Sequence, residues 1–170
     1  MKAFTNIIEK AKTSKWSLRI LNLGVSRMIP FNKPHGFKVL QITDNKLVTY
    51  CPYKKSNFNH IRGIHACALA TLSELTTGLM LMSRLDSAEY RIIMQSFQIE
   101  YLYQAKKHVT ATWEVSDEWL QEKVIEPLKS TDAVLIPCPI EIKDEDGNVI
   151  TKATINWQIK SWSKVRTKVK

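Results

Sequence analysis

A single carboxylate, Glu74, lies near the middle of a stretch whose other residues are mostly apolar or small. The stretch runs from Gly63 to Leu81, and no other acidic residue occurs between Arg62 and Arg84. Burying an unpaired carboxylate costs several kcal/mol or forces it into the neutral form. Glu74 is therefore either the partner of a buried Arg or Lys, or a titratable group at a functional site.

Asn59, Gly63 and His65 precede Glu74 and form with it the pattern N-x3-G-x-H-x8-E. An apolar run as long as the one around Glu74 is typical of a buried helix. The first turn of a helix leaves N–H groups unpaired and carries the positive end of the helix dipole. The pattern thus places a polar loop and a helix N-terminus ahead of the carboxylate.

The composition indicates one globular domain with an anionic partner. The chain has 170 residues, and its 44% hydrophobic content is enough for a packed core. A net charge of +9 favours nucleic acid, an anionic membrane surface or a phosphorylated small molecule. Cys51, Cys67 and Cys138 show no pairing pattern, so we expect free thiols in a cytoplasmic protein. The first residues lack the apolar run of a signal peptide.

Periodicity and turn residues predict the order of the elements. An amphipathic helix comes first, then two strands, the apolar helix and at least four more strands, with one short helix among these. The expected landmarks are Gly24 after a helix over Phe4–Leu23, Asp44–Asn45 in the first hairpin, Ser116 and Pro127 at the start and end of the short helix, and residues 146–148 in the last hairpin.

This order fits an α+β fold in which one mostly antiparallel sheet wraps around one long central helix. We expect a single domain over residues 1–170, with an N-terminal helix in 1–24 and the core in 31–165. The apolar helix is also long enough to cross a membrane. Glu74 at its midpoint would cost about 2.5–3.5 kcal/mol there, and no second apolar run accompanies it. We therefore predict no membrane span.

The sequence resembles the hotdog-fold thioesterase superfamily, in particular acyl-coenzyme A thioesterases of the phenylacetic-acid-degradation type. Those proteins carry an Asn, then a Gly and a His entering the central helix, then an Asp or Glu nine residues after the His. Asn59, Gly63, His65 and Glu74 keep this register. The stretch "IEYLYQAKKHVTATWEV" also looks like a strand of the family. The stretches "PFNKPHGFKV" and "NHIRGIHACALATLSEL" look closest to a branch described as a domain of unknown function.

The resemblance implies hydrolysis of an acyl-coenzyme A thioester, with no cofactor or metal besides this substrate. Glu74 would be the general base or the nucleophile. The Ala66 N–H and the Asn59 side chain would stabilise the oxyanion. His65 would orient the loop or approach the leaving sulfur. The residues expected to contact the substrate are Gly63, Thr77, Lys54 and Lys55, of which the lysines would suit the phosphates of coenzyme A.

The distance along the helix from its N-terminus to Glu74 indicates whether one chain can form the site alone. Nine helical residues span about 13.5 Å, too far for the helix N-terminus and Glu74 of one chain to act on one carbonyl. The resemblance implies a homodimer, or a dimer of dimers, in which Glu74 faces the oxyanion site of an antiparallel partner.

Two positions depart from the family pattern. Many relatives have Gly-Gly after the His, where this chain has Ala66–Cys67. In some relatives a Ser on the strand after the helix positions the water, and Met94 occupies that place here. Thr77 is a candidate replacement, because residues three apart share a helix face with Glu74.

Other functions stay open. A non-enzymatic binder of acyl or lipid thioesters would use the same cleft. The basic tail Ser161–Lys170 suits a nucleic acid or a membrane surface, but no nucleic-acid-binding motif accompanies it, so we expect no nucleic-acid partner. Cys67 beside His65 suggests a thiol nucleophile. His60, His65 and Cys51 do not have the spacing of a zinc site.

Overall fold

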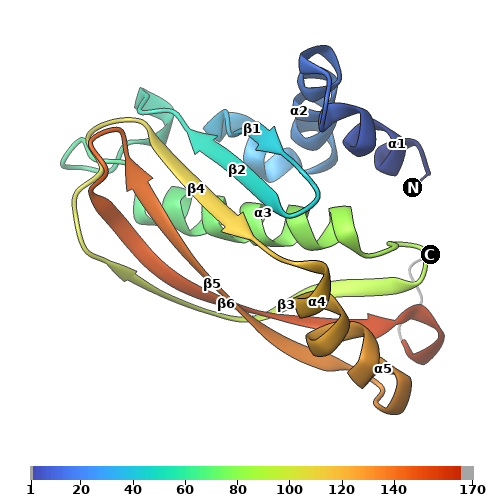
Figure 1. Ribbon diagram of the computed structural model, residues 1–170. Coiled ribbons are helices and arrows are strands. Elements are labelled where there is room, and N and C mark those ends of the chain that lie inside the picture. The colour runs from blue at the N-terminus through green and yellow to red at the C-terminus, as the bar shows by residue number, and fades with distance from the viewer. Residues whose placement is uncertain (1, 166–170) are drawn as a thin grey trace.

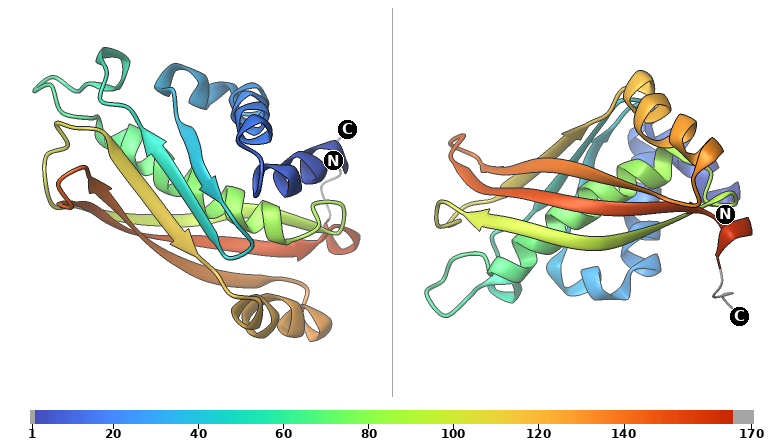
Figure 2. Two further views of the ribbon diagram at one scale, coloured as in Figure 1. Left: turned by 45° about the horizontal axis from the view of Figure 1, so that its top comes forward. Right: turned by 90° about the horizontal axis from the view of Figure 1, so that it is seen from below.

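The structure, a computed structural model, describes residues 2–165. Six strands form one antiparallel sheet in the order β1-β2-β4-β5-β6-β3, and this sheet curves around helix α3 (Figure 1). The N-terminal helices α1 and α2 lie on the opposite side of α3 from β5 and β6 (Figure 2). The α+β hotdog fold predicted from the sequence is confirmed.

Both expected hairpins are present. The glycine in the turn of the second, Gly147, has a φ of 85°, which residues with a side chain rarely adopt. The strands are β1 (Lys38–Ile42), β2 (Lys46–Cys51), β3 (Tyr90–Tyr101), β4 (Val109–Glu114), β5 (Val134–Asp144) and β6 (Val149–Ser161).

Helix α3 (Ala66–Arg84) is the central helix. Its mean hydropathy of 1.3 over an 18-residue window would suit a membrane span, but 61% of that window is buried inside the protein. An apolar helix covered in this way is the core helix of a folded domain. Its apolar character is accounted for by the sheet that wraps it.

Two threonines fix how α3 is rotated against the sheet. The Thr76 hydroxyl bonds the hydroxyl of Thr49 on β2 at 2.6 Å, and Trp157 of β6 donates its ring N–H to Thr77 at 2.9 Å. The Trp157 ring also packs on Gly78, where an added Cβ would lie 2.8 Å from it. Thr76 and Thr77 are thus held against β2 and β6.

The N-terminal segment is helical, but the expectation of one helix over Phe4–Leu23 is wrong. Two helices are present, α1 (Lys2–Ala11) and α2 (Lys15–Met28), and Gly24 lies inside the second. The Ser14 hydroxyl accepts a hydrogen bond from the Ser17 N–H at 3.2 Å. Serine at this position satisfies an otherwise unpaired N–H and starts a new helix.

The short helix begins as predicted but does not end at Pro127. Ser116 caps α4 (Asp117–Leu120) by accepting from the Trp119 N–H at 3.1 Å. A wider π-helical turn over Gln121–Ile125 follows, and Pro127 then lies in the first turn of α5 (Glu126–Ser130). The backbone stays helical through Ile125 and Glu126, so the helical segment continues across Pro127, and the wider π turn comes just before the residue that cannot donate an N–H.

The two edges of the sheet differ. At β1 the Asn22 side chain from α2 occupies the outer backbone groups of Val39, accepting from its N–H at 2.6 Å and donating to its carbonyl at 2.9 Å. The other edge strand, β3, has no strand on its outer side among residues 2–165. Ile93, Met94 and Tyr101 on β3 are exposed apolar residues. An uncovered, apolar edge of this length invites pairing with another chain.

Candidate active site

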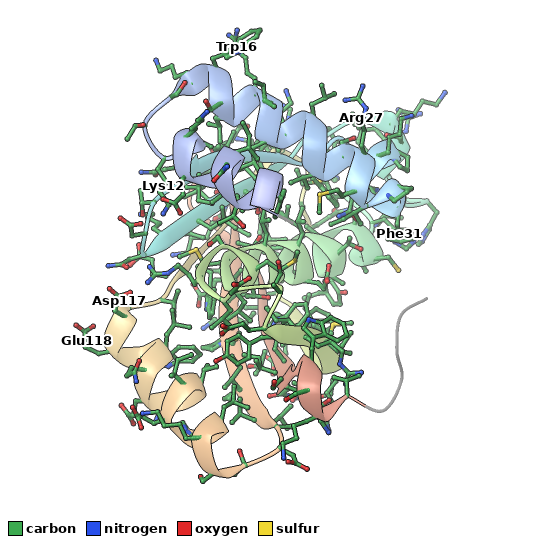
Figure 3. The ribbon with its side chains drawn as sticks, turned by 90° about the vertical axis from the view of Figure 1, so that its right-hand side faces the viewer. Lys12, Trp16, Arg27, Phe31, Asp117 and Glu118 are labelled. Carbon is green, nitrogen blue, oxygen red and sulfur yellow. The ribbon has the colours of Figure 1, made fainter. Side chains whose placement is uncertain are left out.

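Glu74 lies where two cavities meet. The first, of about 150 Å³, is bounded by α1, α2, α3, β3 and β6 and is apolar apart from Glu74. The second, of about 270 Å³, lies between the short 3-10 helix η1 (Pro30–His35), α3 and β3. Ile29 and Glu74 line both. Phe31 of η1 lines the second cavity, and Figure 3 labels it just beyond the end of α2.

The carboxylate of Glu74 has no counter-charge. Burial raises its pKa above the ordinary value of 4.5, and no charged group acts against this shift. Within residues 2–165 no Lys or Arg forms an ion pair with it. The alternative of a structural carboxylate paired with a buried Arg or Lys therefore finds no support in one chain. A desolvated acid at a cavity is the arrangement found where a carboxylate takes up protons near neutral pH.

Glu74 should lower the stability of the folded protein at neutral pH. Because folding raises its pKa, stability is lost as pH rises from about 4.5 through the folded-state pKa. We expect Glu74→Gln to melt at a higher temperature than wild type at pH 7, and the difference to vanish below about pH 4. Melting curves from pH 3.5 to 8 measure this. Glu145→Gln, at an exposed turn position, is the control; a Glu74→Gln protein that melts lower than wild type at pH 7 contradicts the prediction.

Asn59 braces the loop before α3 through its side-chain oxygen. Its Oδ1 accepts from the N–H groups of Ile61 at 3.1 Å and Gly63 at 2.9 Å. Its backbone N–H and the Gly63 carbonyl close the same loop at 2.8 Å. These bonds leave the Nδ2 group of Asn59 as the donor for any further partner. Gly63 is buried, and an added Cβ would lie 3.0 Å from the Gln104 side chain.

His65 is the N-cap of α3. Its Nδ1 accepts from the Cys67 N–H at 3.0 Å, so a neutral ring carries its proton on the exposed Nε2. The same bond weighs against a Cys67–His65 pair, because the ring nitrogen serves the backbone of Cys67. Cys51, Cys67 and Cys138 are all free thiols, as predicted. Among the described residues no acceptor bonds the Ala66 N–H, so it stays available at the helix N-terminus.

The other residues expected to contact the substrate line neither of the two cavities at Glu74. Thr77 is fully buried and lines neither cavity, and its hydroxyl is engaged by Trp157. Lys54 and Lys55 lie in the loop after β2, which reaches the N-terminus of α3 where the His65 N–H donates to the Asn57 carbonyl at 2.7 Å. Asn59, Gly63, His65, Ala66 and the two lysines thus cluster at one end of α3. Glu74, two turns along the helix, is about 12 Å away.

The second cavity contains one residue expected from the sequence and one that was missed. Met94 lines it with Glu74, which agrees with the expected position of the water-positioning serine of some relatives. Asn32 lines it as well and was missed, because nothing in the sequence "PFNKPH" separates a buried asparagine from one in an exposed loop. The basic tail can be followed only in part, since residues 166–170 lie outside the described ones.

The comparisons with known proteins agree with this fold. A family model described as "Domain of unknown function (DUF4442)" matches residues 18–159. The chain belongs to this family. No curated protein matches it in sequence. The family match covers α2, the sheet and α3, so the hotdog architecture and the helix that carries Glu74 lie within it.

Solved structures share the fold at low sequence identity. A protein of unknown function from Pseudomonas aeruginosa, described as a probable thioesterase, has a TM-score of 0.78 and 21% identity over 84% of this chain and 95% of that one. A Staphylococcus aureus thioesterase has a TM-score of 0.62 and 17% identity over 77% and 98%. A Haemophilus influenzae thioesterase has a TM-score of 0.62 and 11% identity over 82% and 90%. At these identities the likeness shows the fold.

Proposed function

We propose that the protein hydrolyses an acyl-coenzyme A thioester, with Glu74 as the general base. The observation that carries the proposal is the unpaired, desolvated carboxylate at the junction of two cavities. The apolar cavity suits an acyl chain, and the second cavity, with Asn32, Thr71 and Glu74, suits the reacting end. An engineered apolar cavity of about 150 Å³ binds benzene, so the first cavity fits an acyl group of about that size.

The second half of the site comes from a partner chain. The uncovered β3 edge and its apolar side chains border the second cavity through Met94 and Phe97. A second copy docked there in antiparallel orientation would bring its own Ala66 N–H and Asn59 Nδ2 to the Glu74 side. A two-fold interface of this kind is self-complementary and builds two equal sites. Light scattering that finds a stable monomer at micromolar concentration would remove this part of the proposal.

The reaction follows from these groups. Glu74 accepts a proton from water as the water oxygen attacks the thioester carbonyl, and the C=O electrons move to the oxygen. The partner's Ala66 N–H and Asn59 Nδ2 stabilise that oxyanion. The tetrahedral intermediate collapses, the C–S bond breaks, and the thiolate takes the proton held by Glu74. The products are a carboxylic acid and a free thiol. Lys54 and Lys55, beside the same helix end, are placed to bind the coenzyme A phosphates.

A protein of similar fold has an amide and a carboxylate at the same spacing as Asn59 and Glu74. In the Staphylococcus aureus protein a glutamine and a glutamate were each replaced by alanine, and these two positions are fifteen residues apart. Asn59 and Glu74 are fifteen residues apart in this chain. Both pairs combine an amide side chain with a carboxylate, which is the combination that oxyanion binding and base catalysis require.

A substrate panel tests the function. Acyl-coenzyme A esters from acetyl to palmitoyl, with phenylacetyl and benzoyl, are incubated with the protein and a thiol reagent. We expect thiol release, fastest for acyl groups of about six carbons. The alternative, a binder without turnover, rests on the same cavities and the departures at Ala66 and Met94. It predicts saturable binding with no thiol release.

A further inference from the structure

The amide side chain of Asn32 is buried and makes no hydrogen bond to any other described residue. Asn32 is 4% exposed, and within residues 2–165 neither its Oδ1 nor its Nδ2 has a partner. An unsatisfied buried polar group costs about 1–3 kcal/mol, so a folded protein rarely keeps two on one side chain without a reason.

A second buried asparagine shows what a structural amide does in this fold. Asn57 is 1% exposed, and its Nδ2 donates to the carbonyls of His35 and Pro52, each at 2.9 Å. Its Oδ1 bonds the His35 ring at 3.0 Å. Asn57 holds η1 against the loop after β2. Asn32, in the middle of the same η1 segment, makes no side-chain hydrogen bond to any other described residue.

Asn32 lines the same cavity as Glu74. Most other lining residues are apolar, and the one hydroxyl among them, Thr71, donates to the Cys67 carbonyl at 2.7 Å. Among the residues that line this cavity, Asn32 is thus the one whose side-chain N–H group has no hydrogen-bond partner. Its place is fixed by backbone: the Asn32 N–H donates to the Ile29 carbonyl at 3.0 Å, and η1 ends at Gly36 with a φ of 69°.

We propose that Asn32 is a catalytic residue that binds the attacking water together with Glu74 of the same chain. Its Oδ1 accepts one hydrogen of the water, and Glu74 accepts the other, which leaves a lone pair of the water oxygen for the carbonyl carbon. Its Nδ2 donates to a second water in the same cavity. The cavity of about 270 Å³ is several times the roughly 30 Å³ that a water molecule occupies, so water and acyl carbonyl fit together.

This role rests on the proposed thioesterase function, and it supplies the second group needed to orient the attacking water. A carboxylate alone fixes one hydrogen of a water molecule and leaves its rotation free, whereas two acceptors fix both hydrogens. Held in that way the water approaches the carbonyl in one orientation, which is the source of the rate gain from positioning. Met94 stands where some relatives have a serine for this task, and Asn32 supplies the missing polar group from η1.

Asn32→Leu separates this role from a structural one. The leucine is close in size and removes both orphan atoms, so we expect the melting temperature to stay equal to that of wild type or to rise. We expect kcat to fall about 10- to 100-fold with KM within threefold. Asn57→Leu is the matched control, and it should lower the melting temperature because it leaves the groups around His35 and Pro52 unpaired. Asn32→Ser, which restores a small donor and acceptor, should recover part of kcat.

The outcomes are distinct. If the wild type is active and Asn32→Leu keeps more than a third of the wild-type kcat, the role of Asn32 is overturned and the proposed function stands. A melting temperature for Asn32→Leu that falls as far as that of Asn57→Leu, with Asn32→Ser no better than leucine in kcat, marks a structural residue and also overturns it. Wild type that releases no thiol from any substrate of the panel overturns both proposals.

Discussion

Replacing Glu74 by glutamine should lower kcat by about 10²- to 10⁴-fold, the usual worth of a general base. Glutamine keeps the size of the side chain but cannot accept the proton of the attacking water. Because the oxyanion donors and both cavities remain, we expect KM to change little. Thiol release followed across a range of substrate concentrations gives both constants.

The pH dependence of the wild type gives a second readout of the same residue. Burial raises the pKa of Glu74 above 4.5, and the base works only when ionised. We therefore expect kcat/KM to fall as pH drops through this raised pKa, and the residual activity of Glu74→Gln to lack that acidic limb. Glu74→Asp retains a carboxylate one methylene further back, so its kcat/KM should lie between those of wild type and Glu74→Gln. Activity of Glu74→Gln above a tenth of wild type would exclude the role of base.

The sequence was informative where a local pattern determines the outcome. Period-two alternation and turn residues located the strands, and the long apolar run located α3, because both patterns record which side of an element is buried. Within one chain His65 caps α3 and Asn59 braces the loop before it. Their bonds are to neighbours in sequence, so a local pattern can suggest them.

The missed helix break had a local signal, because the Ser14 hydroxyl caps α2 by accepting from the Ser17 N–H. The other misses depended on contacts between distant segments. Thr77 shares a helix face with Glu74 by spacing alone, yet Trp157, eighty residues away, engages its hydroxyl. Asn32 reaches the Glu74 cavity because that cavity lies between η1, α3 and β3, and no sequence window contains all three elements.

Mixing two inactive variants should restore activity if the site is shared between chains. Glu74→Gln removes the base. Asn59→Asp keeps an oxygen for the Ile61 and Gly63 N–H groups, so the loop keeps its brace, while it replaces the Nδ2 donor by a negative charge that repels the oxyanion. In a mixed dimer, one site receives both lesions and the other receives neither. Each mixed dimer should therefore work at about half the wild-type rate, although both parent proteins are nearly inactive.

Restored activity is evidence for a shared site only if it accompanies subunit exchange. Exchange is started by mild denaturant or dilution and followed by mass spectrometry of the intact dimers, and thiol release is measured on the same samples. We expect activity to rise in step with the mixed-dimer fraction and to be absent when either variant is treated alone. If Asn59 and Glu74 instead served one site within a chain, every site in the mixed dimer would carry one lesion. Complete exchange without any gain in rate would then reject the antiparallel dimer as the catalytic unit, because the roughly 12 Å between the helix N-terminus and Glu74 would have to be closed in some other way.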